Sequence, residues 1–240
     1  MLDGRAARAE GLAVTSDERK DGAMTYHGAV TPGGTPQVRE LANLTITKFS
    51  VSEMDNNVYL LRCQRTDEQV LIDAADDAPR ILEVVGEDGL RRVVTTHQHW
   101  DHHRALPEVV AATGAEAVAG APDASELPVP VDRPVTDGDR IAVGDCELEV
   151  IQLVGHTPGS IALLYDDPVG TPHLWTGDSL FPGGPGKTWS PEDFTSLIGD
   201  LEAKVFARLP DETWFYPGHG DDSTLGEQRP HLAEWRARGW

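Results

Sequence analysis

The residues best suited to do chemistry are four histidines and an aspartate between positions 97 and 103. Imidazole is the commonest side-chain metal ligand, and carboxylate joins it at zinc, iron or manganese. His97 and His99 would point roughly 200° apart on a helix, but toward the same side on an extended segment or loop. The apolar run at 91–96 predicts a short buried strand, so the cluster follows the carboxyl end of a strand. Asp101 and His102 then fall where the chain turns, which predicts a second ion beside the first.

In this cluster one residue separates His97 from His99, and one residue separates His99 from the pair Asp101-His102. This spacing resembles the signature of the metallo-β-lactamase superfamily of hydrolases. Three later segments, at 155–160, 176–181 and 216–220, resemble further motifs of that family and occur in the family's order. The resemblance implies one ion held by His97, His99 and His156, a second held by Asp101, His102 and His219, and Asp178 as a bridge between them.

The centre implied by this resemblance contains two divalent ions, with zinc favoured and iron or manganese as alternatives. Two ions about 3.5–4 Å apart share a water molecule and lower its pKa to near neutrality. The nucleophile is then a bridging hydroxide, positioned by Asp101 and Asp178 as metal ligands, and no serine or cysteine nucleophile is required. One ion also polarises the attacked carbonyl and stabilises the oxyanion.

Leaving-group chemistry favours a thioester substrate. An amine needs a proton to leave, whereas a thiolate, whose parent thiol has a pKa of about 8.5, leaves without one. Residues 178–188 resemble the glyoxalase II and persulfide dioxygenase branch, and residues 217–230 resemble compact single-domain glyoxalase II-like proteins. This implies hydrolysis of S-2-hydroxyacyl thioesters, with glutathione, mycothiol or another thiol as the carrier. The alternatives are a mononuclear iron persulfide dioxygenase and a lactonase that uses the same site.

Several residues near the ligand motifs allow two interpretations. Asp73 resembles the family's aspartate that supports metal ligands from behind, or it caps the helix that follows. Lys187 and Thr188 are predicted substrate contacts, or they form a turn before a helix. His103 is a polar residue at the pocket rim or, as the favoured interpretation, a surface histidine. Trp189 walls the pocket or serves packing alone.

The resemblance covers 44–240 and implies an α/β fold, the four-layer αββα sandwich, in one domain. Residues 1–40 are predicted to be a disordered or loop-like N-terminal extension, in which 1–23 lack periodicity, and 41–240 the hydrolase domain. Gly144-Asp145 predicts a hairpin turn. Periodicity and turn signals predict strands at 44–49, 58–63, 69–73, 91–96, 115–119, 140–143, 146–154, 161–165, 173–175 and 213–216, a loop at 121–140, and helices at 79–85, 106–113, 194–207 and 225–238.

The composition argues against several classes of partner. The 240 residues carry a formal net charge of −20, which opposes binding to nucleic-acid phosphates and to anionic membranes. Cys63 and Cys146 are far apart in the sequence and in no CxxC motif, and such low cysteine usage suits a reducing cytoplasm. No apolar run is long enough to span a bilayer, and residues 1–23 contain no hydrophobic signal core. We expect a cytoplasmic monomer or homodimer that acts on a small molecule, with no nucleic-acid or membrane partner.

Overall fold

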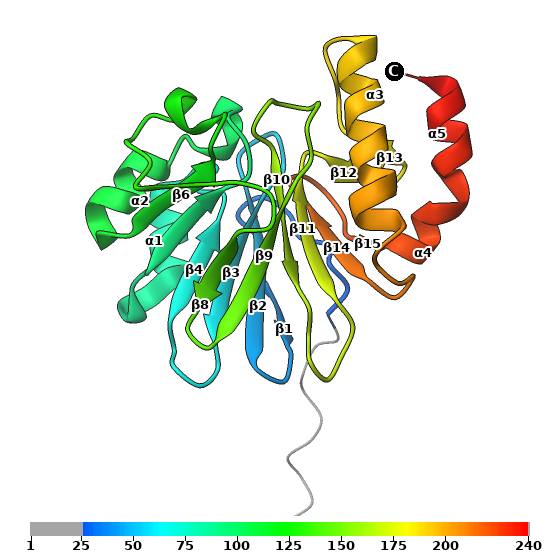
Figure 1. Ribbon diagram of the computed structural model, residues 1–240. Helices are drawn as coiled ribbons and strands as arrows, with labels where there is room; N and C mark the ends of the chain where they lie inside the picture. Colours follow the sequence, from blue (N-terminus) through cyan, green and yellow to red (C-terminus); the bar gives the residue numbers. More distant parts are fainter. Residues whose placement is uncertain (1–25, 240) are drawn as a thin grey trace, which may run out of the picture.

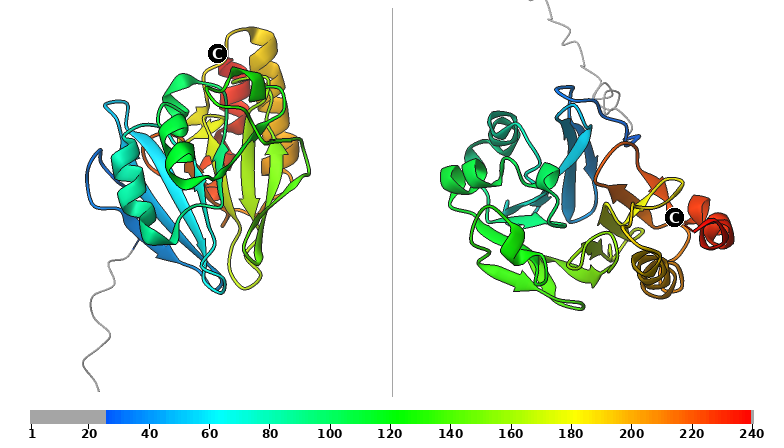
Figure 2. Two further views of the ribbon diagram at one scale, coloured as in Figure 1. Left: turned by 90° about the vertical axis from the view of Figure 1, so that its left-hand side faces the viewer. Right: turned by 90° about the horizontal axis from the view of Figure 1, so that it is seen from above.

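Two β-sheets pack face to face, and helices cover the outer side of each sheet, in the computed structural model (Figure 1). The structure describes residues 26–239, so the prediction for 1–23 lies outside the described residues. Views from the side and from above show the same arrangement, with helices on either side of the paired sheets (Figure 2). The predicted αββα layering is therefore confirmed.

The first sheet has seven strands in chain order, and its pairing changes from antiparallel to parallel halfway along. Parallel neighbours need a crossover, which is supplied by α1 (Ala78–Val85) between β4 and β5 and by α2 (Leu106–Thr113) between β5 and β6. The strands are β1 (Gln37–Glu40), β2 (Leu44–Val51), β3 (Asn56–Cys63), β4 (Gln69–Ile72), β5 (Arg92–Thr95), β6 (Glu116–Gly120) and β7 (Arg133–Val135).

The second sheet has six strands in the order β15-β14-β11-β10-β9-β8, and only the β11–β14 pair is parallel. The predicted hairpin turn at Gly144-Asp145 is confirmed, because it joins β8 and β9 directly. The strands are β8 (Arg140–Val143), β9 (Cys146–Gln152), β10 (Ile161–Tyr165), β11 (His173–Gly177), β14 (Trp214–Pro217) and β15 (Ser223–Thr224), with a separate small hairpin of β12 (Leu180–Phe181) and β13 (Gly184–Pro185).

Three apolar clusters hold these layers together. The first lies between the sheets and joins Leu61 of β3 to Val150 of β9 and Trp175 of β11. The second packs α1 and α2 on the first sheet, and the third packs helices α3 (Pro191–Asp200) and α5 (Leu232–Arg238) on the second sheet. Strands β4 and β10 are buried along their whole length, as expected for strands covered on both faces. Within residues 26–239, no helix is long and apolar enough to cross a membrane.

The C-terminal helices differ from the prediction in two places. The helix predicted at 194–207 begins earlier, as α3 (Pro191–Asp200), and continues as a π-helical segment (Leu201–Phe206). The side chain of Ser190 accepts a hydrogen bond from the backbone N–H of Asp193 and so caps α3. The single helix predicted at 225–238 was wrong, because Pro230 cannot donate a backbone hydrogen bond inside a helix. The structure has α4 (Leu225–Gln228), a 3-10 turn (Arg229–His231) and α5 (Leu232–Arg238).

Two short strands lie where the sequence analysis expected loops. Strand β1 occupies the end of the predicted 1–40 extension and pairs with β2, with Gln37 opposite Lys48. Strand β7 lies within the predicted 121–140 loop and pairs with β6. Both are edge strands of three or four residues, too short to show a periodic pattern, and β1 is mostly polar while β7 contains a proline.

Candidate metal centre

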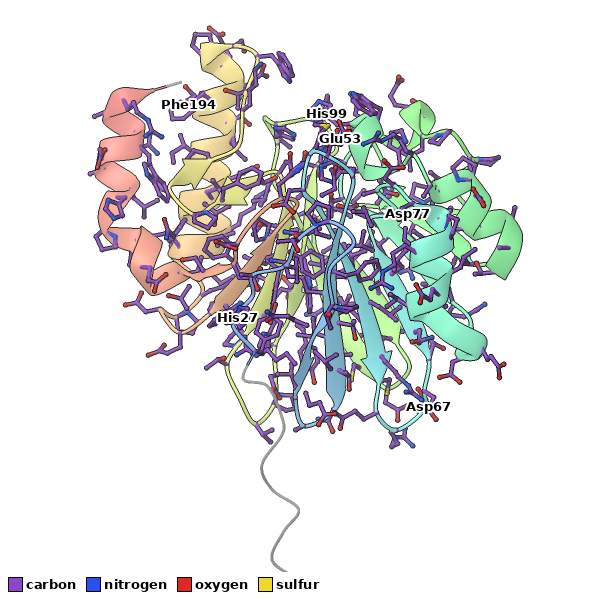
Figure 3. All side chains as sticks on the ribbon, turned by 180° about the vertical axis from the view of Figure 1, so that it is seen from behind. His27, Glu53, Asp67, Asp77, His99 and Phe194 are labelled. Atoms are coloured by element: carbon purple, nitrogen blue, oxygen red, sulfur yellow. The ribbon has the colours of Figure 1, made fainter. Side chains whose placement is uncertain are left out.

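All seven predicted ligand residues lie in loops or, for Asp101 and His102, in a short 3-10 helix, at one end of the paired sheets. Residues 97–102 follow β5 of the first sheet, whereas His156 lies between β9 and β10 of the second. Asp178 follows β11 and His219 follows β14. Figure 3 labels His99 at this upper end of the molecule. The two sheets therefore each contribute ligands to one cluster.

His97, His99 and His156 form the first ligand group, with one nitrogen of each within 4.8 Å of the others. His156 Nε2 lies 2.9 Å from His99 Nδ1 and 3.3 Å from His97 Nε2. Nitrogen ligands on a tetrahedral zinc ion lie about 3.3 Å apart, given Zn–N distances of 2.0–2.1 Å. The three imidazoles therefore have the spacing of ligands around one ion.

Asp101, His102 and His219 form the second group. His219 Nε2 lies 3.2 Å from His102 Nε2 and 3.3 Å from Asp101 Oδ2. Asp178 lies between the two groups, because its carboxylate oxygens are 3.4 Å from His102 Nε2 and 3.8 Å from His156 Nε2. The structure thus brings together the predicted residues in the predicted grouping.

The cluster contains a buried carboxylate oxygen without a hydrogen-bond partner, which a bound cation would satisfy. Asp178 Oδ1 is buried and has no hydrogen-bond partner among the described residues. Gly218 lies against it, and a β-carbon at that position would be only 2.1 Å from the same oxygen. A side chain larger than hydrogen at this position would therefore displace the aspartate. The buried donors of this set, imidazole and carboxylate, suit zinc, iron or manganese.

Burial and the neighbouring charges divide the histidines into two kinds. Burial lowers the pKa of His97 well below its usual value, and burial also lowers the pKa of His156. Both are therefore neutral, which is the form that binds a metal. Burial opposes the charge of His219 too, but the carboxylates of Asp101 and Asp178 raise its pKa to about 9. The second group thus lies in a negative potential that attracts a cation.

Backbone carbonyls fix the orientation of two imidazoles. His156 Nδ1 donates to the carbonyl of Lys187 at 2.7 Å, which leaves its Nε2 directed at the first group. His219 Nδ1 donates to the carbonyl of Met54 at 2.8 Å and leaves its Nε2 directed at the second. Hydrogen bonds of this kind set the tautomer and ring orientation of histidine ligands.

Asp73 fixes the orientation of the His102 imidazole in the same way. Its carboxylate accepts a hydrogen bond from His102 Nδ1 at 2.9 Å and two more from the backbone N–H and hydroxyl of Thr96, at 2.7 and 2.8 Å. The alternative role as a helix cap was wrong, because the cap of α1 is Asp77, whose side chain accepts from the N–H of Arg80. Asp73 supports a predicted ligand rather than the helix.

Replacement of Asp73 by asparagine is expected to weaken metal binding at the second group by roughly 10- to 100-fold, because the amide is a weaker acceptor for His102. The affinity is measured by titration with zinc against a competing chelator. Asp67→Asn is the matched control, since Asp67 has the same positive φ of 59° and lies exposed at the opposite end of the molecule (Figure 3). Unchanged affinity in Asp73→Asn would contradict the supporting role.

Two residues that the sequence analysis did not single out connect the ligand loops. Asn56 donates from its side chain to Asp101 Oδ2 at 3.0 Å, and its backbone forms an isolated antiparallel bridge with His219. Asp123 is fully buried and joins the loops of the first group. It accepts hydrogen bonds from Gln98 N, Thr157 Oγ1 and Gly159 N at 2.9, 2.6 and 2.6 Å.

The other residues considered near the motifs lie around the cluster rather than in it. His103 is buried and hydrogen-bonds the carbonyl of Gln98 at 2.9 Å, so the favoured interpretation as a surface histidine was wrong. Trp189 is 65% exposed, and its ring lies edge-on to that of His99 with centroids 6.2 Å apart. Lys187 and Thr188 lie in the segment between β13 and α3, and both line a cavity beside α3 and α5.

Comparisons with known proteins agree with this geometry. The sequence model of the Metallo-beta-lactamase superfamily matches residues 51–219. A hydroxyacylglutathione hydrolase from Rhodospirillum rubrum is 36% identical over 181 residues, covering 75% of this chain and 67% of the relative. A hydroxyacylglutathione hydrolase-like protein from Mus musculus is 35% identical, covering 69% and 58%. The chain thus spans about two thirds or less of the length of these relatives.

Solved structures show the same fold. The crystal structure of ETHE1 from Myxococcus xanthus aligns with a TM-score of 0.69 at 30% identity, covering 78% of this chain and 82% of that one. The crystal structure of TTHA1623 in a di-iron-bound form aligns with a TM-score of 0.62 at 29% identity, covering 75% and 95%. One of these similar proteins thus holds two metal ions.

Proposed function

The chain belongs to the metallo-beta-lactamase superfamily, and from this we propose that it is a dinuclear metal-dependent hydrolase of S-2-hydroxyacyl thioesters. The predicted family and fold class are confirmed by the match over 51–219 and by the similar solved structures. The observation that carries the proposal is the position of the Asp178 carboxylate, within 3.8 Å of ligand atoms from both groups. Such a residue can be shared by two ions.

Each ligand group would bind one ion. His97, His99 and His156 offer neutral nitrogens to one ion, while Asp101, His102 and His219 offer a carboxylate and two nitrogens to the other. When bound, a pair of divalent ions activates water and polarises the attacked carbonyl. Zinc is the ion we favour, with iron or manganese as alternatives.

The charge states of the aspartates favour a thioester over an amide. Burial opposes ionisation of Asp178, but the adjacent His102 and His219 hold its pKa well below the usual range. Asp101 has a lowered pKa for a similar reason, through His219, His102 and Asn56. Neither carboxylate therefore carries a proton for the leaving group, and a thiolate is the leaving group that does not need one.

The names of the relatives support a hydroxyacyl thioester as the substrate. The R. rubrum and mouse proteins are named for a thioester of glutathione, and this chain shares with the first 36% of aligned residues. The strong negative charge supports a small-molecule substrate rather than a nucleic acid. We keep the cytoplasm as the predicted compartment, and a monomer or homodimer as the predicted assembly.

The first test is the metal content of protein purified without added metal, measured by mass spectrometry, followed by assays on S-D-lactoylglutathione, an oxygen ester and a lactone. We expect two divalent ions per chain and fastest turnover of the thioester. One iron per chain, with oxygen uptake on a persulfide, would instead indicate the dioxygenase. Faster turnover of the lactone with two ions bound would indicate the lactonase.

A further inference from the structure

The two cysteines of the chain lie in one apolar cluster between the sheets, although they are far apart in the sequence. Cys63 is the last residue of β3 in the first sheet, and Cys146 is the first residue of β9 in the second. Asp67, whose backbone N–H donates to the carbonyl of Cys63, is labelled in Figure 3 at the opposite end of the molecule from His99. Any reaction of this pair therefore takes place away from the ligand cluster.

The β8–β9 hairpin brings the two thiols together. Asp145, in the hairpin turn, donates its backbone N–H to Cys63 Sγ at 3.5 Å, and Cys146 is the next residue along the chain. Cys146 Sγ donates to the carbonyl of Asn43 at 3.4 Å, and the residue after Asn43 is paired with Cys63 in the first sheet. Both thiols are free, and they lie within hydrogen-bonding reach of each other. Neighbouring thiols on two packed strands can close to a disulfide if the backbone is close enough.

A cavity of about 420 Å³ leads to the pair. Both cysteines line it, together with residues of the β8–β9 hairpin and Tyr165 of β10. The two side chains are only 1% and 7% exposed, for Cys63 and Cys146, so a large reagent does not reach either sulfur. A small neutral oxidant such as hydrogen peroxide suits this entrance.

The surroundings of the two thiols differ. Burial opposes ionisation of Cys63, but hydrogen bonds from the Thr66 hydroxyl and from the backbone N–H groups of Arg65 and Thr66 lower the pKa of its thiol. Burial raises the pKa of the Cys146 thiol. The thiolate is the nucleophile in thiol chemistry, so Cys63 has the character of the attacking sulfur and Cys146 that of the resolving one.

We propose that Cys63 and Cys146 form a peroxide-sensitive dithiol, which closes to a disulfide between the two sheets. The Cys63 thiolate attacks one oxygen of hydrogen peroxide, the O–O bond breaks, and hydroxide leaves and takes up a proton, so that Cys63 becomes a sulfenic acid. The sulfur of Cys146 then attacks the sulfenic sulfur, the S–O bond breaks, and water leaves with the thiol proton of Cys146. Two thiols are oxidised to one disulfide while hydrogen peroxide is reduced to two molecules of water.

The disulfide would link two sheets that are otherwise joined by packing. The loop that it closes runs from the end of β3 to the start of β9, and so contains β4 to β8 together with α1 and α2. A cross-link that closes a long loop stabilises the folded state mainly by restricting the unfolded chain. This inference concerns a site remote from the ligand cluster and does not depend on the proposed hydrolase function.

The test treats the purified protein with hydrogen peroxide, blocks the remaining thiols with an alkylating reagent in denaturant, and maps the peptides by mass spectrometry. We expect a cross-linked peptide that joins Cys63 to Cys146 within one chain, and its disappearance after treatment with dithiothreitol. The urea midpoint of unfolding should rise by about 1 M in the oxidised protein. Both measurements use the wild-type chain, so they require no substitution in the core.

Two cysteine variants assign the roles. Cys146→Ala should stop at the sulfenic acid, which dimedone traps on Cys63, whereas Cys63→Ala should leave Cys146 reduced. Thiols that remain fully open to alkylation after peroxide, or disulfides that join separate chains, would overturn the inference. Oxidation of Cys146 in Cys63→Ala at the wild-type rate would overturn the assignment of Cys63 as the attacking sulfur.

A surface variant tests the thiolate without a change in either cysteine. Thr66→Val removes the hydroxyl that stabilises the Cys63 thiolate, and it should slow the reaction with peroxide about threefold. Thr136→Val is the matched control, because Thr136 is also exposed and its hydroxyl bonds to Asp139 instead. Equal rates in Thr66→Val and Thr136→Val would contradict the role of this hydrogen bond.

Discussion

Replacement of Asp178 by alanine is expected to reduce the metal content from two ions per chain to one or fewer, and to lower kcat/KM by at least about a thousandfold. The carboxylate lies between the two ligand groups, so its loss affects both. Metal ions contribute several kcal/mol to such reactions, and about 1.4 kcal/mol corresponds to a factor of ten in rate. Metal analysis and steady-state kinetics on the same preparation measure the two effects together.

Asp166→Ala is the control for this substitution, because Asp166 is exposed and belongs to neither ligand group. It should retain two ions and full turnover. His102→Ala is the complementary variant, which should lose the ion of the second group. Full activity in Asp178→Ala with two ions still bound would exclude a bridging role for this aspartate.

Lys48→Met is expected to reduce the free energy of unfolding by about 3–5 kcal/mol, because it leaves a buried carboxylate without its counter-charge. The side chains of Lys48 and Asp222 are both fully buried, and Lys48 Nζ lies 2.6 Å from Asp222 Oδ1. The ammonium also donates to the carbonyls of Gly28 and Gly220, at 2.6 and 2.8 Å. Urea unfolding measures the loss.

Two further variants separate the charge from the packing. Lys48→Met combined with Asp222→Asn removes both charges, and it should be more stable than Lys48→Met alone. Lys204→Met removes a partly exposed lysine that pairs with Asp200, and it should cost less than about 1 kcal/mol. If Lys48→Met were no more harmful than Lys204→Met, the buried pair would contribute little to stability.

The loss of unfolding free energy in Lys48→Met, relative to the wild type, should also become smaller as the pH falls. Burial raises the pKa of Asp222, although Lys48 acts in the opposite direction, so removal of Lys48 raises this pKa further. The folded variant then binds a proton at a higher pH than the unfolded chain does. The free energy of unfolding of Lys48→Met therefore increases, relative to that of the wild type, as the pH falls through the pKa that Asp222 has in the folded variant. Unfolding curves at several pH values measure this trend.

The ligand set could be predicted from the sequence because its residue types are rare and their spacing is specific. Four histidines within seven residues, after an apolar strand, point to a metal without knowledge of the fold. Most strands were predictable for a similar reason, since buried runs such as 69–72 and 161–165 contain few polar residues. The break at Pro230 was missed by the prediction of one helix over 225–238, although proline cannot continue a helix and is itself a signal for such a break.

Other parts of the site depend on contacts between distant segments. Asn56 and Asp123 have no motif of their own, and their roles come from partners that are 45 and 34 residues away in sequence, at Asp101 and Thr157. The cavity beside α3 and α5 depends on the packing of α5 near α3, which no local pattern encodes. The edge strands β1 and β7 have only four and three residues, which is too short for a periodic signal.

The ligands come from both sheets, and this couples metal loading to the folded state. The ligands between His97 and His102 follow a strand of the first sheet. His156, Asp178 and His219 each follow a strand of the second sheet. In the unfolded chain these residues are far apart, so they bind an ion together only when the two sheets are docked. Any free energy gained on binding is thus added to the free energy of unfolding. Bound ions would hold the two sheets together, and the chain would then resist unfolding and proteolysis better with metal than without it.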